Sequence, residues 1–318
     1  MRPVLRRRNF LPMAAAGMTA CSGGTAPPVP ARRAAVAIVR AGSYAEDLVA
    51  RLTEGIEACG LDVRGKRILL KPNLVEFDRS TAINTDAAVV AAAAETVARL
   101  GAAEVLIGEG PGHRRDAFSL AEEAGYRQGI PRFESLFVDL NRDDVTPVER
   151  FAHHPRIFLP NTALGVDLII SLAKMKTHHW AGATLSMKNL FGLVPGSVYG
   201  WPKNLLHYTG IARSVVELNR IFRKTFAIVD GITGMEGNGP IQGTPKHAGV
   251  LVMGRDLAAV DATCCRIMGI DPVKVQYLAM AMGTGVLDAS GIEQRGEAVG
   301  TVRTNFALFG KHQALRLA

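Results

Sequence analysis

The chain has 318 residues, of which 48% are hydrophobic and 21% are charged, an ordinary composition for a globular protein with a large core. The formal net charge of +8 suggests a nucleic-acid partner at first, but four of the 37 basic residues lie before Cys21, at Arg2, Arg6, Arg7 and Arg8. Without them 33 basic residues stand against 29 acidic ones and no Lys/Arg block or aromatic-basic stripe remains, so we expect no nucleic-acid partner.

The first residues have the pattern of an export signal. RRRNFLPMAAAGMTACSGG has a basic start, a short and weakly apolar centre and small residues at its end, whereas a membrane span needs about 20 apolar residues. Residues 7–11, RRNFL, resemble the twin-arginine motif R-R-x-F-L, whose export machinery carries proteins that are already folded. We therefore expect export across the bacterial inner membrane and contact with that machinery.

Residues 18–21, MTAC, resemble a lipobox, in which the Cys receives lipid after cleavage, although Met18 departs from the usual Leu. Because a Gly/Pro-rich tether follows over residues 22–33, we favour lipidation of Cys21 over cleavage that leaves its thiol free. The sequence thus predicts a signal peptide over residues 1–21, a tether over residues 22–33 and an α/β domain over residues 34–318. The mature protein would be periplasmic or anchored to the membrane by its lipid.

From Ala34 onward, short apolar runs alternate with longer amphipathic segments. The short runs predict strands over residues 34–39, 67–70, 104–107, 136–140, 166–172, 226–230 and 248–253. Helices are predicted over residues 44–59, from a cap at Thr85 or Asp86 to Leu100, and over residues 117–124, 207–224 and 256–268. Residues 195–202 form a Gly/Pro-rich loop long enough to cover a site. This alternation indicates an α/β fold, a mainly parallel sheet with helices on both faces, arranged as one large domain or two lobes.

The remaining cysteines favour an ordinary packed core. Adjacent cysteines such as Cys264 and Cys265 bridge only with strain, so packing inside an apolar helix is favoured, and Cys59 stands alone. No C-x-x-C series is present, which argues against an iron–sulfur cluster or a structural zinc site. In the same helix Asp256 is the expected N-cap, and a buried Asp261 would need hydrogen-bond partners.

Polar side chains and glycines follow four of the predicted strands. They occupy residues 71–73, residues 108–115 (GEGPGHRR), residues 173–189 (AKMKTHHWAGATLSMKN) and residues 230–240. Ligands of parallel sheets bind beyond the carboxyl ends of the strands, so one shared pocket is expected. The alternative is that these loops are polar and glycine-rich as loops generally are, and GEGPG fits a plain turn at least as well as a phosphate loop.

The residue types in these segments favour an anionic small-molecule ligand. Lys174 and Lys176 face the same side of an extended chain, and with Lys188 they would concentrate positive charge that suits a phosphate or carboxylate. His178 is the candidate general acid or base because its ordinary pKa lies near neutral, and Lys176 is the second candidate catalytic residue. The candidate ligand-binding residues are Lys71, Asn73, Glu109, Lys174, Thr177, Lys188, Asn189, Asp230 and Glu236.

A divalent cation is a candidate cofactor. Glu109, Asp230 and Glu236 would supply an oxygen-rich site. Adjacent His178 and His179 should point to opposite faces of an extended chain, so at most one would be a ligand, and no H-x-x-x-H or H-E-x-x-H spacing supports zinc. The alternative is that the acids pair with the lysines across the pocket.

Five segments carry a family resemblance. They are residues 69–75 (LLKPNLV), the GEG after a strand, and residues 174–196, 229–240 and 254–272. Together they resemble the domain-of-unknown-function family 362 from about Ala34 to near the C-terminus, and KMKTH…LSMKN is the most specific part. The resemblance implies one α/β unit and the same site positions, while the family's activity is unassigned. Some members carry a ferredoxin-like iron–sulfur domain, but this chain lacks those cysteines, so an electron-transfer role is not carried over.

These observations lead to three hypotheses. The first is an exported, membrane-tethered enzyme that acts on an anionic small molecule, with a divalent cation as an option. The second is a non-catalytic binding lipoprotein, in which the same lysines serve and His178 is not needed. The third is an assembly factor for another exported protein, which would need a large exposed apolar patch.

Overall fold

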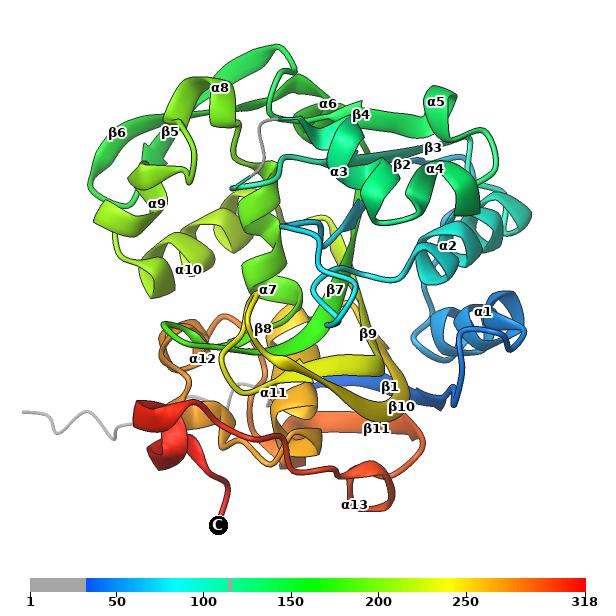
Figure 1. Ribbon diagram of the computed structural model, residues 1–318, viewed down its shortest axis with the longest axis vertical. Helices are drawn as coiled ribbons and strands as arrows, with labels where there is room; N and C mark the ends of the chain where they lie inside the picture. The colour runs from blue at the N-terminus through cyan, green and yellow to red at the C-terminus, as the bar shows by residue number, and fades with distance from the viewer. Residues whose placement is uncertain (1–32, 114–115) are drawn as a thin grey trace, which may run out of the picture. The chain divides into compact units, whose positions relative to one another are not determined.

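A nine-stranded sheet organises the part of the chain that the structure, a computed structural model, describes, namely residues 33–113 and 116–318 (Figure 1). Its strands are β1 (Ala34–Arg40), β2 (Arg67–Pro72), β3 (Glu104–Glu109), β4 (Phe137–Asp139), β7 (Leu168–His178), β8 (Gly182–Thr184), β9 (Thr225–Glu236), β10 (Thr244–Gly254) and β11 (Ile292–Gly296). Their order is β11-β1-β10-β9-β7-β2-β3-β4, and β8 pairs with β7. The predicted signal peptide and nearly all of the tether lie outside the described residues.

Most strand pairs are parallel. The pairs β1–β11, β2–β3, β2–β7, β3–β4 and β7–β9 are parallel, whereas β1–β10, β9–β10 and β7–β8 are antiparallel. The carboxyl ends of β2, β3, β7 and β9 therefore share one edge of the sheet. Strands β5 (Val145–Phe151) and β6 (His154–Pro160) form a separate hairpin that the sequence pattern did not predict.

Helices cover both faces of the sheet, as the strand–helix alternation predicted. One face carries α1 (Leu48–Ala58), α2 (Ala87–Arg99) and α3 (Ala117–Glu123), and the other carries α10 (Ile211–Ile221), α11 (Leu257–Ile267) and α12 (Gln276–Ala281). Each face of the sheet has its own hydrophobic core. Side chains of β2 point alternately to the two faces, so Ile68 and Leu70 pack against the first set of helices and Leu69 against the second. The α/β prediction with a mainly parallel sheet is confirmed.

The remaining helical segments are short. The α-helical ones are α4 (Tyr126–Gly129), α5 (Phe133–Leu136), α6 (Asn161–Gly165), α7 (Ser186–Asn189), α8 (Gly196–Tyr199), α9 (Asn204–Tyr208) and α13 (Val299–Val302). The 3-10 turns are η1 (Leu190–Leu193), η2 (Pro272–Lys274), η3 (Ala289–Gly291) and η4 (Gly310–Leu315). The predicted loop over residues 195–202 thus contains one helical turn.

Helix ends follow the capping residues, with one correction. Asp86 rather than Thr85 caps α2, and Asp256 caps α11 as expected. The single helix predicted over residues 207–224 is wrong, because Gly210, whose φ is 92°, separates α9 from α10. Cys264 and Cys265 are fully buried within α11, as the packing interpretation expected.

Strand β7 is the largest departure from the sequence prediction. The predicted strand ended at Leu172 and gave way to a loop, but β7 continues to His178 and every one of its residues is buried. Its second half pairs with β8 on one side and β9 on the other, and the pairing with β9 shifts register between Lys174 and Lys176. Strand β9 likewise continues past Asp230 to Glu236. Two of the expected polar loops are therefore buried strand.

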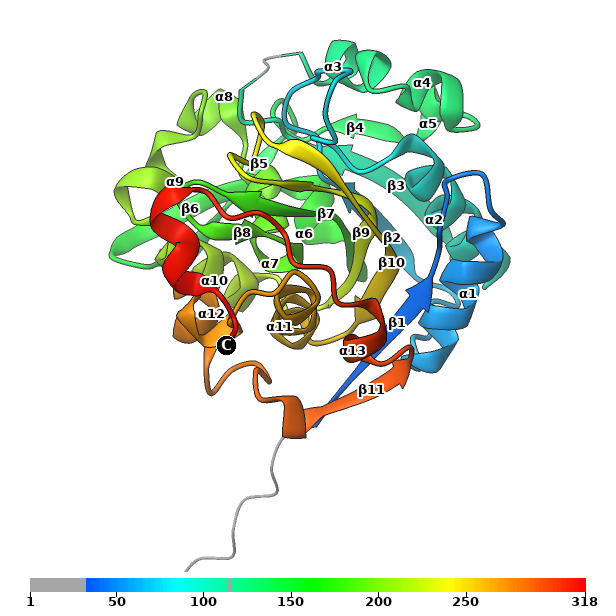
Figure 2. The same cartoon turned by 60° about the horizontal axis from the view of Figure 1, so that its bottom comes forward.

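The C-terminal segment covers the end of β7. Figure 2 shows it running across the side of the sheet that carries α11 and α12 and ending beside α12. The backbone N–H of Asp271 donates to the carbonyl of Leu315, and Nε2 of His312 lies 2.9 Å from the carbonyl oxygen of His179. Residues far apart in sequence thus converge near the carboxyl edge.

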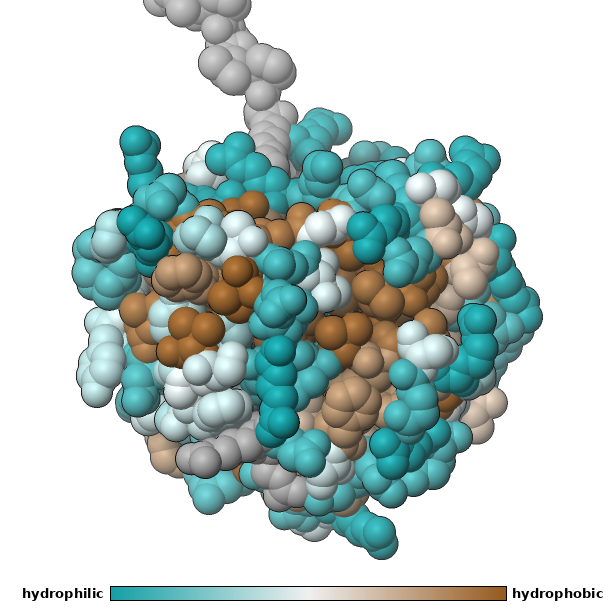
Figure 3. All heavy atoms as spheres, turned by 90° about the horizontal axis from the view of Figure 1, so that it is seen from above, coloured by the Kyte–Doolittle hydropathy of each residue, from teal (hydrophilic) through white to brown (hydrophobic). Residues whose placement is uncertain are grey.

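The surface shows apolar groups divided by polar ones on the face seen from above in Figure 3. Large exposed apolar side chains among the described residues include Leu164, Trp180, Val198 and Tyr208. None of the helices within the described residues has the length and apolar character needed to cross a bilayer.

Candidate functional site

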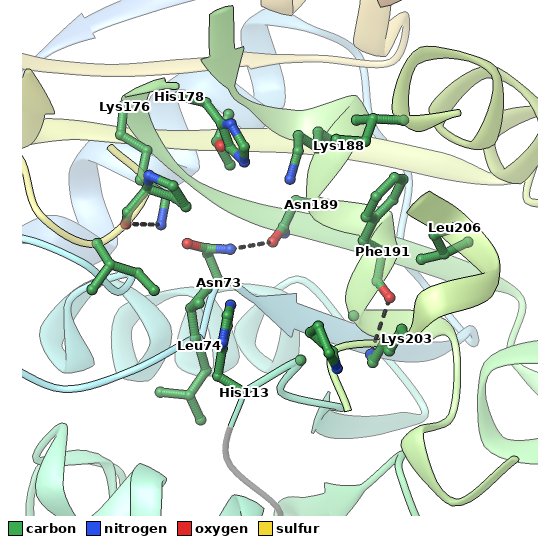
Figure 4. A pocket seen from close by; sticks show the side chains of 18 of the residues that line it. Asn73, Leu74, His113, Lys176, His178, Lys188, Asn189, Phe191, Lys203 and Leu206 are labelled. Atoms are coloured by element: carbon green, nitrogen blue, oxygen red, sulfur yellow. Dashed lines mark hydrogen bonds between the residues drawn. The ribbon is translucent and has the colours of Figure 1, made fainter. Parts of the chain in front are cut away.

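A cavity of about 330 Å³ lies at the carboxyl edge of the sheet (Figure 4). Asn73 after β2, Gly110 after β3, Lys176 within β7 and Asn238 after β9 all line it. The structure therefore brings the four predicted strand ends around one space. Helix α7, η1 and the segment that precedes α9 complete the wall.

Positive charge dominates this cavity. Among the described residues its lining includes four lysines and a single carboxylate: Lys71, Lys176, Lys188, Lys203 and Glu109. With each group in its ordinary charge state, four positive charges face one negative charge. The sequence analysis foresaw all of these residues except Lys203.

Lys71 and Glu109 form a buried ion pair. Their side chains are 1% and 2% exposed, and the Lys71 ammonium donates to Oε2 of Glu109, to Oδ1 of Asn189 at 3.1 Å and to the carbonyl of Pro72 at 2.7 Å. Three acceptors match the three N–H groups of an ammonium ion. Burial lowers the pKa of Lys71, while the charge and hydrogen bond of Glu109 act in the opposite direction. The pair is thus internally compensated.

Two asparagines extend this network to the cavity. Asn189 donates to the carbonyl of Lys71 at 2.9 Å and to Oγ of Ser171 at 3.0 Å, and its Oδ1 accepts from the amide of Asn73 at 3.2 Å. Oδ1 of Asn73 and Oγ1 of Thr184 are buried with no hydrogen-bond partner among the described residues. Since buried polar atoms are normally paired, these two atoms suggest that a ligand completes the site.

Lys176 has only backbone acceptors. Its Nζ donates to the carbonyl of Ile83 at 2.8 Å and to that of Pro240 at 3.3 Å, and its side chain is fully buried. Burial, reinforced by the positive charge of Lys188, holds the pKa of Lys176 well below its usual range. An anionic ligand beside Lys176 would offset this lowering of its pKa.

Lys203 is the functional candidate that the sequence reasoning missed. It is 3% exposed, and its Nζ donates to the carbonyl of Gly110 and to that of Phe191 at 3.1 Å. Burial lowers its pKa to about 7. Its φ of 64° lies in the left-handed region, which is strained for a lysine and is found at functional sites. Its surrounding letters, WPKN, give no sign of this in the sequence.

Lys188 has the fewest polar contacts of the four lysines that line the cavity. Its Nζ points into the cavity (Figure 4) and has no hydrogen bond or ion pair among the described residues. It lies 4.8 Å from the centroid of the Phe191 ring. Burial, and then the charge of Lys71, lower its pKa to about 8.

His178 is a neutral hydrogen-bond donor in this setting. Its Nδ1 accepts from the backbone N–H groups of Trp180 at 3.0 Å and Ala181 at 3.2 Å, so the ring proton of the neutral form is on Nε2. Burial, and then the charge of Lys188, lower its pKa far below the ordinary value. These effects move the pKa of His178 away from the near-neutral value on which its acid–base assignment relied.

His179 does not turn away from its neighbour as expected. Both His178 and His179 line the cavity, and their ring centroids are 5.0 Å apart. The expectation was wrong because β7 ends at His178, so His179 is no longer part of an extended strand. Nδ1 of His179 lies 2.8 Å from the carbonyl oxygen of Gly239.

Lys174 and Asp230 lie outside the cavity. They form an ion pair of 2.7 Å, and both are buried. The hydroxyl of Tyr44 accepts from Lys174 at 2.9 Å and donates to Asp230 at 3.1 Å. The expected cluster of Lys174, Lys176 and Lys188 is thus wrong, because Lys174 is neutralised in a separate hollow that Tyr44 also lines.

Thr177 and Glu236 also contact other parts of the fold. Oγ1 of Thr177 donates to the carbonyl of Gly237 at 2.9 Å. Glu236 accepts from the backbone N–H of Ala307 at 2.8 Å and lies 3.7 Å from Nζ of Lys246. Neither residue lines the cavity.

The three candidate cation ligands do not converge. Glu109 pairs with Lys71 and Asp230 with Lys174, whereas Glu236 lies at the end of β9. The described residues contain no group of three or more His, Cys, Asp or Glu side chains suited to hold a metal ion. The alternative expectation, that acids pair with lysines, describes Glu109 and Asp230 correctly.

Asp261 fixes the helix that carries Lys188. Its buried carboxylate accepts from the N–H of Ser186 at 2.8 Å, from the hydroxyl of Ser186 at 2.5 Å, from the N–H of Met187 at 3.1 Å and from the hydroxyl of Tyr277 at 3.3 Å. Burial raises its pKa to about 7, although these hydrogen bonds favour the charged form. Helix α11 thereby holds the first residues of α7.

The chain is similar to a known protein family and to a curated protein. The model of the family described as "Domain of unknown function (DUF362)" matches residues 68–266. The "Thylakoid-associated protein sll1697" of Synechocystis sp. (strain ATCC 27184 / PCC 6803 / Kazusa) is 31% identical over 256 residues, which cover 77% of each chain.

Two solved structures show only distant likeness. The lactate racemase apoprotein from Thermoanaerobacterium thermosaccharolyticum has a TM-score of 0.46 at 11% identity and covers 77% of this chain. A Thermotoga maritima protein solved by a structural genomics consortium has a TM-score of 0.40 at 16% identity and covers 70%. The chain spans 59% of the length of each of these two structures. The family model and the curated relative together show that the chain belongs to the domain-of-unknown-function family DUF362.

Proposed function

We propose that this protein is an enzyme that acts on a small molecule bearing a carboxylate or phosphate, bound in the cavity at the carboxyl edge of the sheet. The observation that carries the proposal is that Lys176, Lys188 and Lys203 line one cavity and none has a carboxylate partner among the described residues. Clustered, mostly buried ammonium groups are unfavourable without a counter-charge. An anionic ligand supplies that charge.

The other lining residues define what the ligand needs besides its anionic group. Nε2–H of His178 is a donor, and Oδ1 of Asn73 is an unpartnered acceptor. Leu74, Phe191 and Leu206 add apolar wall. A cavity of about 330 Å³ lies at the lower end of the usual range for small-molecule sites. The fitting substrate is therefore small, with one anionic group, at least one hydroxyl or carbonyl and a short carbon skeleton.

Calorimetry tests the anion site with inorganic phosphate and pyruvate as probes. Because an anion raises the pKa of nearby lysines, binding near pH 8 should take up protons, seen as heats that differ between buffers of different ionisation enthalpy. Lys176→Met should weaken binding about tenfold or more, since it removes a charge-assisted contact. Lys224→Met removes one charge from an exposed lysine and should leave binding unchanged. Equal affinities in the two variants, or binding without proton uptake, would contradict the proposal.

A non-catalytic binding protein is the second candidate, and the neutral state of His178 favours it. Turnover separates the two functions. A ligand co-purified from the native host and incubated with fresh protein should change in mass if the protein is an enzyme. His178→Ala should then slow the change. An unaltered ligand whose affinity survives His178→Ala supports a binding protein instead.

We also propose that the protein is exported and held at a membrane by lipid on Cys21. The support is the sequence of residues 7–11 and 18–21, and the curated relative is named as thylakoid-associated. Replacing Arg7 and Arg8 with Lys should keep the precursor in the cytoplasm. Cys21→Ala should abolish labelling by radioactive palmitate and release exported protein into the soluble fraction. Membrane retention of the unlabelled Cys21→Ala variant would contradict the anchor.

A further inference from the structure

The amine of Lys188 differs from the other three lysine amines of the cavity. Lys71 has three acceptors for its N–H groups, and Lys176 and Lys203 have two each. Lys188 has none among the described residues. Figure 4 shows its nitrogen directed into the space between His178 and Asn189. Lys188 is also the only one of the four with a partly exposed side chain, so a ligand can reach it.

The backbone on both sides of Lys188 is fixed even though its amine is free. On one side Asp261 holds Ser186 and Met187 through three hydrogen bonds, and a fourth, from the hydroxyl of Tyr277, fixes the Asp261 carboxylate itself. On the other side the amide of Asn189 is bonded to the Lys71 carbonyl. A free amine on a rigid support is the arrangement that covalent catalysis by lysine requires, because the nitrogen must be positioned without being consumed by a partner.

We propose that Lys188 forms an imine with the carbonyl carbon of a substrate that carries an aldehyde or ketone together with a carboxylate or phosphate. The inference rests on the proposed function, because the buried lysines of the same cavity must hold the anionic group. Lys176 and Lys203 provide that charge from positions where their nitrogens are already bonded to backbone carbonyls. Lys188 is left to react.

The step balances without a redox partner. The neutral amine attacks the carbonyl carbon, and the electron pair of the C=O π bond moves to the oxygen, which takes up a proton. The nitrogen then releases one of its two N–H protons, which leaves a neutral carbinolamine. Its hydroxyl takes up a second proton and leaves as water when the C–O bond breaks, while the nitrogen lone pair forms the C=N bond, so a protonated imine results. The imine that remains can accept electrons from an adjacent bond, so the reactions served are those that break a bond beside a carbonyl carbon.

Neighbouring groups suit these intermediates. Nε2–H of His178 is placed to donate to a carbonyl oxygen, and Oδ1 of Asn73 can accept from a carbinolamine hydroxyl. The pKa of Lys188 of about 8 leaves a substantial neutral fraction at neutral to mildly alkaline pH, where an ordinary lysine has almost none. Lys203, whose pKa is lowered to about 7, also has a neutral fraction, but it is less suited because its amine already donates to the carbonyls of Gly110 and Phe191.

Borohydride trapping tests the inference on the folded full-length protein. Pyruvate and dihydroxyacetone phosphate serve as the carboxylate and phosphate probes in separate arms, followed by borohydride reduction and peptide mass mapping. We expect one reduced adduct, on Lys188, from at least one probe, and the reacting arm identifies the anionic group. Lys188→Arg keeps the charge and should bind the probe in calorimetry but give no adduct. Lys224→Arg should react like the unmodified protein.

The outcomes separate this inference from the proposed function. If the unmodified protein binds a probe in calorimetry but gives no adduct after borohydride reduction, the imine proposal is wrong and the proposed anion site still holds. An adduct on Lys176, Lys203 or surface lysines, at equal yield in Lys188→Arg, also overturns it. Absence of both heat and adduct with both probes overturns the two proposals together. Unchanged thermal melting of Lys188→Arg shows that loss of the adduct is not loss of fold.

Discussion

Replacing Glu109 with Gln isolates the energetics of the buried ion pair beneath the cavity. The carboxylate accepts from the Lys71 ammonium, from the N–H of Leu74 at 3.1 Å and from the N–H of Gly110 at 2.9 Å. A Gln side chain has the same shape but one acceptor oxygen fewer. Its NH₂ group must therefore face at least one of these donors, and Lys71 loses its counter-charge.

Removing one partner of a buried ion pair costs about 3–5 kcal/mol of unfolding free energy. Both side chains here are no more than 2% exposed, so water cannot replace the lost contact. Lys71 can limit the loss by releasing its proton, since burial already lowers its pKa. A lysine whose pKa is lowered by folding must release a proton to fold, and this cost shrinks as pH rises. The destabilisation should therefore approach the full range at pH 6 and be smaller at pH 9.

Urea unfolding followed by circular dichroism at the two pH values measures this effect. The double variant Lys71→Met with Glu109→Gln should recover most of the stability, because no uncompensated charge is left. Stability of Glu109→Gln equal to that of the unmodified protein at pH 6 would refute the reasoning. The reasoning would also be refuted if the double variant lost more unfolding free energy than Lys71→Met and Glu109→Gln lose together as single variants.

Three further predictions follow from the same network. A Cβ at Gly192 would lie 1.8 Å from Oε1 of Glu109, so Gly192→Ala should cost about 1–3 kcal/mol in urea unfolding, whereas Gly300→Ala, with no atom within 4 Å, should be nearly neutral. Because burial raises the pKa of Asp261 to about 7, its contribution to stability is present near pH 4 and is lost as pH rises to 7; Asp261→Asn should flatten this part of the stability–pH profile. Sulfate, whose charge is constant, should bind progressively more weakly from pH 6 to pH 9 in calorimetry as Lys203 and its neighbours lose protons, and a flat profile would count against the anion site.

The sheet was predictable because its information is local. The alternation of apolar runs with amphipathic segments predicted strands β1, β2 and β3 and helices α1, α2 and α11, and the predicted ends lie within a few residues of the observed ones. The predicted end of β7 was wrong because the extent of this strand depends on contacts with residues far away in the sequence. KMKTH has the composition of a loop, but it is buried because its polar groups have distant partners: Lys174 pairs with Asp230, and Lys176 bonds to the carbonyl of Ile83. Such partners cannot be seen in a sequence window.

The candidate site was predictable to the extent that it follows the strand-end rule. Lys71, Glu109 and Lys176 each lie at the carboxyl end of a strand, and the rule placed them together. Lys203 follows no strand. It enters the cavity from the segment between η1 and α9, where its hydrogen bond to Gly110 joins residues 93 positions apart. The rule also placed Lys174 in the pocket, which its pairing with Asp230 prevents.

The contrast between compensated and uncompensated lysines is the strongest reason to regard the cavity as functional. On the two neighbouring strands β2 and β7 this fold provides a buried lysine with a carboxylate, Glu109 for Lys71 and Asp230 for Lys174. Lys176 lies two residues from Lys174 on the same strand and receives only backbone carbonyls. An acidic partner would offset the positive charge, as Glu109 does for Lys71. A protein that keeps the charge at a cost in stability, in a space open to small molecules, is expected to use it for binding or catalysis.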